Sequence, residues 1–89
     1  MTEKKVLIKN KLGLHARAAV KLMNLSNRFA SNVRIEKDGN EVDGKSILGL
    51  LTLAAVQGSE ITIKTAGSDE TAALKALAAL VDAKFQEDE

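Results

Sequence analysis

The sequence predicts one α+β domain, a two-layer open-faced sandwich in which three helices cover one face of a four-stranded antiparallel sheet. Its 89 residues are enough for one hydrophobic core and too few for two. Residues 33–37 alternate apolar and charged side chains, which is typical of an antiparallel strand with one face in water. Apolar residues at helical spacing recur elsewhere in the chain. Because helices bury their apolar side against a second layer, we expect the order βαββαβα within a single domain, 1–89.

The first half of the chain predicts a strand, a helix and a hairpin. A short apolar run predicts the first strand over 4–10, and a turn follows it. The first helix is expected over 16–30, where the apolar residues follow helical spacing. The alternating strand 33–37 then pairs with a return strand at 41–42, across the Asp-Gly-Asn turn between them.

The second half predicts a helix, a strand and a last helix. Ser46 stands where a helix N-cap belongs, directly before an apolar run over 47–56 that we expect to be helical. A glycine at position 58 is placed as expected just past a helix end. Apolar residues alternate again over 61–65, which predicts the fourth strand.

The last helix is expected to be capped by Ser68 and to hold Asp69 and Glu70 in its first turn, where negative charge is favourable. The acidic end of the chain, 86–89, is expected to be a mobile tail. The buried stripe of this helix is predicted to consist of Ala73, Leu77, Leu80 and Val81.

Composition excludes several classes of protein. Thirteen Lys and Arg against twelve Asp and Glu leave a net charge of +1, which argues against a nucleic-acid binder. The two aromatic residues, Phe29 and Phe85, form no stacking platform for bases. The chain has no cysteine, so disulfides, thiol catalysis and Cys-based zinc sites are excluded, and we expect neither a metal nor a cofactor.

No segment predicts export or membrane insertion. The N-terminus runs into only three apolar residues, 6–8, which is too short for a signal peptide. The most apolar stretch, 47–56, is about half the roughly 20 residues needed to span a bilayer. We therefore expect a cytoplasmic protein with no membrane partner.

The single histidine, His15, is the residue whose setting suggests chemistry. It lies at or beside the N-cap of the helix predicted from Ala16, where unpaired backbone N–H groups favour an anion. Arg17 can add charge-assisted hydrogen bonds to a phosphoryl group. A neutral imidazole keeps one ring nitrogen as a nucleophile. These residues suit a site that carries phosphate on nitrogen, although a histidine at a helix start is by itself more often a capping or surface residue.

Two separated motifs carry a resemblance to a known family. The segment Gly-Leu-His-Ala-Arg at 13–17 resembles the active-site motif, G-[LIM]-H-[AT]-R-P-A, of the HPr phosphocarriers of the bacterial phosphotransferase system. The segment at 44–53 resembles the K-S-[IL]-[ML]-x-[LV] block of the same family. Residues 60–63 and 66–70 match the family's fourth strand and the start of its last helix, so the resemblance covers essentially the whole chain.

The resemblance implies a phosphocarrier. His15 would accept a phosphoryl group on Nδ1 from phosphorylated enzyme I and pass it to an enzyme IIA domain. Arg17 would steady the phosphate, and Ser46 matches the position that a regulatory serine kinase or phosphorylase acts on in some branches. The protein would act as a monomer, and its partners would dock on the face formed by Ala16, Val20, Ile47, Leu48 and Leu51.

The sequence departs from the family pattern at one position and leaves the branch open. The family's proline after the arginine is Ala18 here, and because alanine is a good helix former the helix should still begin. Residues 10–13 resemble the nitrogen-related HPr paralogues, whereas Ser46 after Lys45 resembles the sugar branch.

Three other functions are alternatives to the carrier. A regulatory binding module could use the same surface without relaying phosphate, and such a module would not need His15. A small nucleic-acid-binding domain is disfavoured by the balanced charge and the scarcity of aromatic residues. An autonomous enzyme is not expected, because the sequence gives no reason to place a second catalytic acid or base beside His15: the nearest acids along the chain are Glu3 and Glu36, and no pattern brings either to the histidine.

Overall fold

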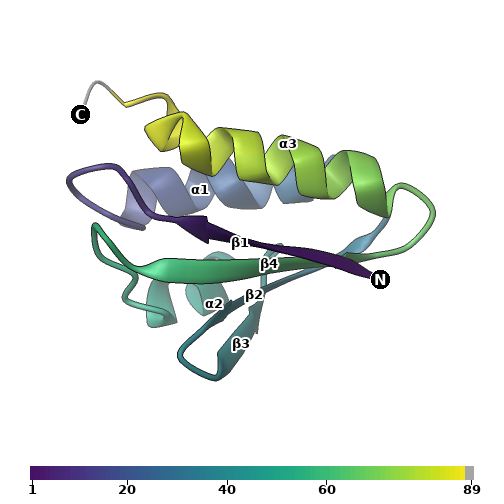
Figure 1. The fold of residues 1–89 in the computed structure, drawn as a ribbon, viewed down its shortest axis with the longest axis horizontal. Helices are drawn as coiled ribbons and strands as arrows, with labels where there is room; N and C mark the ends of the chain where they lie inside the picture. The colour runs from purple at the N-terminus through teal and green to yellow at the C-terminus, as the bar shows by residue number, and fades with distance from the viewer. Residues whose placement is uncertain (88–89) are drawn as a thin grey trace.

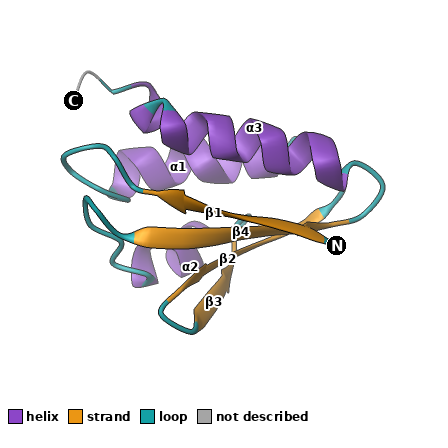
Figure 2. Ribbon diagram, in the orientation of Figure 1, coloured by secondary structure: helices purple, strands orange, loops and turns teal. Residues whose placement is uncertain are grey.

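Four strands form one antiparallel sheet in the order β1-β4-β2-β3 (Figures 1 and 2). The computed structural model describes residues 1–87. Val6 pairs with Ile61, and Ile35 pairs with Ile63. The strands are β1 (Thr2–Leu7), β2 (Asn32–Lys37), β3 (Asn40–Asp43) and β4 (Glu60–Ala66).

Three α-helices cover this sheet. The helices α1 and α3 lie side by side on it, and α2 contacts both α1 and β3 (Figure 1). Leu22 of α1, Leu50 of α2 and Leu77 of α3 are fully buried in one core. The predicted α+β sandwich with the order βαββαβα is confirmed. The helices are α1 (Ala16–Ser26), α2 (Ile47–Thr52) and α3 (Glu70–Asp82), and a short 3₁₀ turn, η1 (Lys84–Gln86), follows α3.

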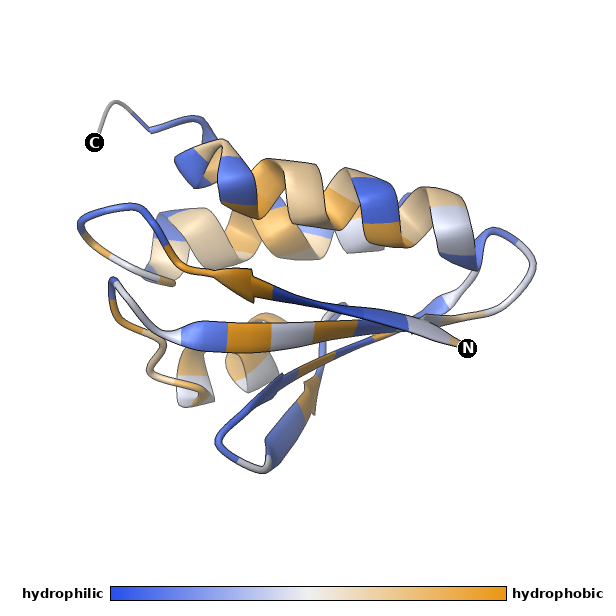
Figure 3. Cartoon of the chain, viewed as in Figure 1, coloured by the Kyte–Doolittle hydropathy of each residue, from blue (hydrophilic) through white to orange (hydrophobic). Residues whose placement is uncertain are grey.

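The alternation predicted from the sequence places one face of the sheet in the core. Ile61 and Ile63 of β4 are fully buried, whereas Thr62 and Lys64 between and beyond them are partly exposed, and Figure 3 shows the same alternation as colour along β4. On the other face, Lys64 Nζ lies 2.6 Å from a carboxylate oxygen of Glu36. Water on that side lets the charged residues of the alternating pattern stay hydrated.

Several predicted boundaries are wrong by a few residues. The first strand begins at Thr2 and ends at Leu7, and α1 ends at Ser26 instead of reaching residue 30. The predicted helix over 47–56 ends at Thr52. Ala54 adopts a left-handed φ of 50°, and the chain then turns so that the Ala55 carbonyl accepts a hydrogen bond from the Leu14 amide, 2.8 Å away. Of the apolar residues after Thr52, Leu53 and Ala55 are therefore buried without forming a helix face, and Val56 is exposed.

The start of the last helix also differs from the prediction. Asp69, and not Ser68, occupies the N-cap position, and α3 begins one residue later at Glu70. The Asp69 carboxylate makes no capping bond; it accepts hydrogen bonds from the Ala30 and Ser31 amides, each at 2.9 Å, and from the Ser31 hydroxyl. Asp69, which the sequence assigned to the first turn of the helix, is instead hydrogen-bonded to donors from another part of the chain. In the predicted stripe, Ala73, Leu77 and Val81 are buried and Leu80 is only partly buried.

Asp69→Asn should lower the free energy of unfolding at neutral pH. The Ser31 hydroxyl and the Ala30 and Ser31 amides hold the pKa of Asp69 below its ordinary value. A carboxyl with a lowered folded-state pKa adds stability above its unfolded-state value of about 3.9, and that stability is lost as pH falls through the folded-state pKa. The difference between variant and wild type should therefore shrink in acid, which urea unfolding at a series of pH values measures.

The matched control is Asp38→Asn in the exposed β2–β3 turn, which should change stability by less than about 0.5 kcal/mol. An Asp69→Asn deficit that is as large near pH 2 as at pH 7 would show that the carboxylate charge is not responsible.

Candidate functional site

The loop that carries His15 is clamped against the segment before β4. After β1, the Ile8 amide donates to the Ser59 carbonyl at 2.8 Å, and the Leu14 amide donates to the Ala55 carbonyl at 2.8 Å. Gly13 has a φ of 68°, and a Cβ on it would lie 2.5 Å from the Ala55 carbonyl oxygen. Only glycine fits this turn and this close approach. These two hydrogen bonds and the close packing of Gly13 thus fix the backbone that leads into His15.

His15 caps α1 with its own ring. Its backbone is extended, with φ −78° and ψ 179°, and its Nδ1 accepts a hydrogen bond from the Arg17 amide at 3.2 Å. The His15 carbonyl accepts from the Ala19 amide at 2.8 Å, which closes the first helical turn. An amide can only donate, so Nδ1 carries a lone pair and no proton. The predicted position of His15 at the start of the helix is confirmed.

The opposite ring nitrogen faces a carboxylate that the sequence did not reveal. Nε2 of His15 lies 2.6 Å from Oε2 of Glu87, 72 residues further along the chain. The other oxygen of Glu87 accepts a hydrogen bond from Nδ2 of Asn10 at 2.9 Å. The expectation that no second titratable group lies near His15 is therefore wrong. Neither spacing nor a motif in the sequence connects these two positions.

Glu87 reaches the site because the chain turns back after α3. Three consecutive residues, Lys84, Phe85 and Gln86, have left-handed φ values of 57°, 55° and 64°. Phe85 is fully buried, and its carbonyl accepts a hydrogen bond from Lys21 Nζ of α1 at 2.7 Å. Figure 1 shows the end of α3 at the same end of the molecule as the loop between β1 and α1. The buried ring of Phe85 therefore anchors the segment that presents Glu87.

The predicted tail, 86–89, overlaps this contact. Gln86 belongs to η1, and Glu87 has the two side-chain partners described above. Residues 88 and 89 lie outside the described part of the chain. Mobility of the tail stays a prediction, but the structure already assigns Glu87 a place in the site.

The carboxylate of Glu87 is ionised at neutral pH. Burial opposes ionisation, but the hydrogen bonds from His15 and Asn10, together with the nearby positive charge of Lys21, hold the pKa of Glu87 below its ordinary value. Only 13% of the Glu87 side chain and 25% of the His15 side chain are exposed to solvent. An ionised carboxylate can only accept hydrogen bonds, so the proton of the imidazole lies on Nε2.

The remaining predicted site residues lie on α1 and α2. Arg17 and Ala16 are exposed in the first turn of α1, and Ser46 caps α2 by accepting a hydrogen bond from the Gly49 amide at 3.3 Å, as expected. The predicted docking residues differ in exposure: Leu48 is 74% exposed, Val20 40% and Leu51 39%, whereas Ile47 is half-buried. Leu50 and Leu53 are core residues, as the sequence indicated.

Two helices that contact each other, α1 and α2, both expose large apolar side chains. Val20 of α1 and Leu48 and Leu51 of α2 are exposed, and Ile47 of α2 is half-buried. Exposed apolar residues in a group commonly mark an interaction site. Other exposed large apolar side chains were not predicted: Met1, Leu7, Leu12 in the loop before His15, and Val56 after α2. We call Val20, Leu48 and Leu51 the apolar patch.

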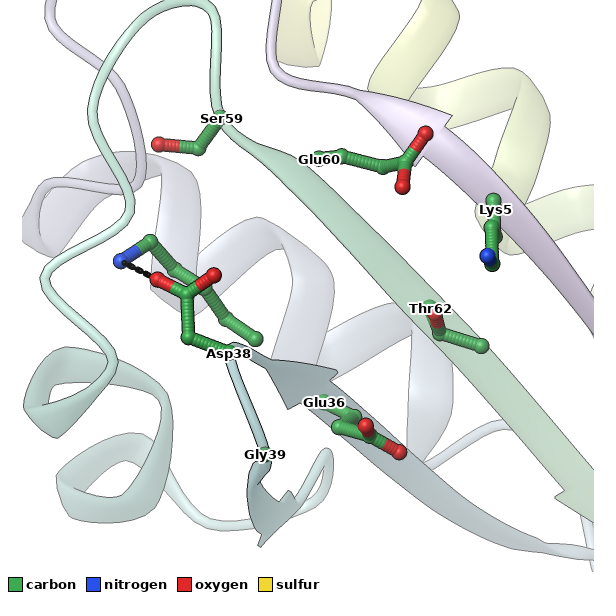
Figure 4. Close-up of a pocket in the computed structure, with 8 residues that line it drawn as sticks. Lys5, Glu36, Asp38, Gly39, Ser59, Glu60 and Thr62 are labelled. Carbon is green, nitrogen blue, oxygen red and sulfur yellow. Dashed lines mark hydrogen bonds and ion pairs between the residues drawn. The ribbon is translucent and has the colours of Figure 1, made fainter.

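A separate hollow of about 350 Å³ lies on the uncovered face of the sheet (Figure 4). Its charged lining residues are Lys5, Lys37, Glu36, Asp38 and Glu60, so it contains both basic and acidic groups. This mixture favours no single class of ligand, and none of the predicted site residues borders it. Within residues 1–87, no group of His, Asp or Glu side chains is arranged to hold a metal ion, and no helix is long and apolar enough to cross a membrane.

The chain is similar over its whole length to known proteins. A family model described as the phosphorylation site of the HPr component of the phosphotransferase system matches residues 2–83. The phosphocarrier protein HPr of Cupriavidus necator is 47% identical over 89 residues, 100% of each chain. The phosphocarrier protein NPr of Shewanella violacea is 48% identical over 85 residues, which are 96% of this chain and 93% of that protein. The crystal structure of HPr-C-His from Thermoanaerobacter tengcongensis superimposes with a TM-score of 0.96 at 40% identity, covering 100% of both chains.

The exposure of the apolar patch predicts that a charge there leaves the fold intact. Leu48→Asp should change the free energy of unfolding by less than about 1 kcal/mol, because the side chain is already in water. The matched control is Leu50→Asp, which buries a carboxylate in the core and should cost more than about 4 kcal/mol. Chemical unfolding of both variants measures the two values. A similar loss at both positions would place Leu48 in the core.

Proposed function

Because the chain belongs to the HPr family of the phosphotransferase system, we propose that His15 accepts a phosphoryl group from phosphorylated enzyme I and passes it to an enzyme IIA domain. The observation that carries this proposal is the state of the His15 ring. Its Nδ1 is unprotonated and lies at the start of α1, within hydrogen-bond reach of the Arg17 amide. A nitrogen with a lone pair is the nucleophile that phosphoryl transfer to histidine requires.

The start of α1 supports the charge that arrives with the phosphoryl group. The first amides of a helix have no acceptor inside the helix, and they carry the positive end of its dipole. A phosphoryl group on Nδ1 would lie where the Arg17 amide already points, so that amide can donate to a phosphoryl oxygen instead of to the ring. The exposed guanidinium of Arg17 adds a charge-assisted contact and remains accessible to a partner.

The apolar patch gives both partners a surface to bind. Val20 on α1 and Leu48 and Leu51 on α2 are exposed, and the flanking Ala16 and Ile47 complete the docking face that we propose for enzyme I and enzyme IIA. The same Leu48→Asp protein that keeps its fold should therefore bind these partners more weakly. No pocket of its own is needed, because the partners complete the site around His15.

The alternative function is a regulatory binding module that uses the same patch without relaying phosphate. The exposed apolar patch suits either function, and the unprotonated Nδ1 also caps α1, but phosphate relay requires this nucleophilic nitrogen whereas a binding module does not. Relatives named HPr and NPr are about equally similar, so the choice between the sugar branch and the nitrogen-related branch stays open. A monomeric protein of the cytoplasm remains the expectation from the sequence.

His15→Ala should abolish acid-labile phosphorylation. Incubation of wild type with phosphoenolpyruvate and enzyme I should add one phosphoryl group, which intact-mass measurement detects before and after acid treatment. His15 is the only histidine in the chain, so its loss removes the acceptor nitrogen. Acid-labile phosphate on the His15→Ala protein would refute the carrier function.

Arg17→Ala serves as the companion variant in the same assay. It should slow transfer by about tenfold or more, because one charge-assisted hydrogen bond is lost, and leave the fold intact. An unfolded Arg17→Ala protein would instead assign Arg17 a structural role.

Ser46→Asp should keep the fold and lower the rate of phosphoryl transfer from enzyme I. The charge is placed at the start of α2, where it is tolerated, but next to Ile47 and Leu48 of the docking face. A partner must desolvate that charge when it binds. Stopped-flow or quenched transfer assays measure the rate.

Ser46→Ala is the matched control: it loses the cap and about 0.5–2 kcal/mol of stability, but it should transfer phosphate at the wild-type rate. Wild-type kinetics in folded Ser46→Asp would leave Ser46 as a helix cap alone and give no support to a regulatory kinase at this position.

A further inference from the structure

Three side chains connect the loop after β1, the start of α1 and the end of the described chain. Asn10 is fully buried, and its Nδ2 donates to the Gly13 carbonyl at 2.7 Å and to Oε1 of Glu87 at 2.9 Å. The second oxygen of Glu87, Oε2, lies 2.6 Å from Nε2 of His15. The two carboxylate oxygens therefore face two different donors, one fixed by the loop and one on the proposed phosphate acceptor.

The direction of the Asn10 amide is determined by its neighbours. The Gly13 carbonyl and the Glu87 carboxylate can only accept, so both must face the Nδ2 hydrogens. In this orientation Oδ1 of Asn10 is buried without a hydrogen-bond partner among the described residues, which is costly. The cost is tolerated because the reversed amide would place its oxygen against two acceptors. Asn10 is thus a fixed donor that holds the Glu87 carboxylate in place.

Both sides of the His15 ring specify the same tautomer. The Arg17 amide donates to Nδ1, which leaves the lone pair there. The Glu87 carboxylate accepts from Nε2, which holds the proton there. A histidine whose one nitrogen is fixed by a carboxylate has its other nitrogen defined in both protonation and direction.

We propose that Glu87 is a positioning residue for phosphoryl transfer, an inference that rests on the function proposed for His15. Its carboxylate orients the imidazole and keeps the proton on Nε2, so that the lone pair of Nδ1 is directed to the start of α1. Asn10 holds the carboxylate in the position that this requires.

The carboxylate also compensates the charge that the ring gains during transfer. The bond between Nδ1 and phosphorus forms while the bond between phosphorus and the donor atom breaks, and the donor keeps that electron pair. No proton moves, so Nε2 keeps its hydrogen and the phosphorylated ring carries a positive charge. The ionised carboxylate, 2.6 Å from Nε2, stabilises this ring. When the phosphoryl group leaves for an acceptor, the electron pair returns to Nδ1 and the ring is neutral again.

Two substitutions separate these effects. Glu87→Ala removes the carboxylate, while the Arg17 amide still donates to Nδ1. Glu87→Gln offers one oxygen and one NH₂ group to two donors. Since Asn10 is a fixed donor, the new oxygen should face Asn10 and the new NH₂ should face His15 Nε2. The imidazole would then accept at Nε2 and carry its proton on Nδ1, so the Arg17 amide would lose its acceptor and the nucleophilic lone pair would be absent from Nδ1.

The experiment measures phosphoryl transfer from enzyme I to Glu87→Ala, Glu87→Gln and the control Glu3→Gln, together with the ¹⁵N NMR signals of the unphosphorylated His15 ring. Glu3 lies near the start of β1, at the end of that strand away from the His15 loop, and its substitution removes the same charge. Both Glu87 variants should transfer about tenfold more slowly than wild type or worse. Glu3→Gln should equal wild type, and only Glu87→Gln should show a proton moved to Nδ1.

Wild-type or faster transfer in folded Glu87→Ala would overturn the proposal, since the carboxylate would then be neutral or obstructive. Wild-type ring signals in Glu87→Gln would overturn it as well. Failure of the proposed function is a distinct result: wild-type protein would accept no phosphate, while the ring signals of wild type and Glu87→Gln would still show whether Glu87 sets the tautomer.

Discussion

The imidazole of His15 is hydrogen-bonded at both nitrogens, and the surrounding structure is arranged to make that possible. The Arg17 amide on one side is available because α1 begins at Ala16, and the Glu87 carboxylate on the other is available because the chain turns back after α3. The loop before His15 is fixed by Gly13 against the Ala55 carbonyl. Without these contacts the tautomer and the direction of the His15 ring would no longer be fixed from both sides.

Most of the fold could be predicted from the sequence because its determinants are local. Alternation at 33–37, the serine before α2 and the helical spacing of apolar residues each depend on a few neighbouring positions. The predicted boundaries are wrong where tertiary contacts outweigh these local preferences. The Asp69 carboxylate accepts hydrogen bonds from the Ala30 and Ser31 amides. After Thr52 the helix ends, and the Ala55 carbonyl accepts a hydrogen bond from the Leu14 amide.

The site was predicted in part for the same reason. His15, Arg17 and the start of α1 are contiguous in sequence, so their relationship was visible there, and the family motif strengthened it. Glu87 was missed because its contact with His15 spans 72 residues and depends on the left-handed turn at Lys84–Gln86 and the burial of Phe85. A position with no motif and no periodicity can be placed only by the three-dimensional structure. Ala18 shows the converse: helix α1 begins at Ala16 without the family's proline, as alanine's propensity indicated.

The central claim is that Nδ1 of His15 receives the phosphoryl group, because that nitrogen carries the lone pair while Nε2 keeps its proton against Glu87. The most direct test is ¹⁵N and ³¹P NMR of the protein after phosphorylation by enzyme I, with the histidine ring labelled. The account predicts coupling between phosphorus and Nδ1, with a hydrogen retained on Nε2. Coupling of phosphorus to Nε2 would contradict the account, because it would require the Glu87 contact to be broken and the ring to be reversed.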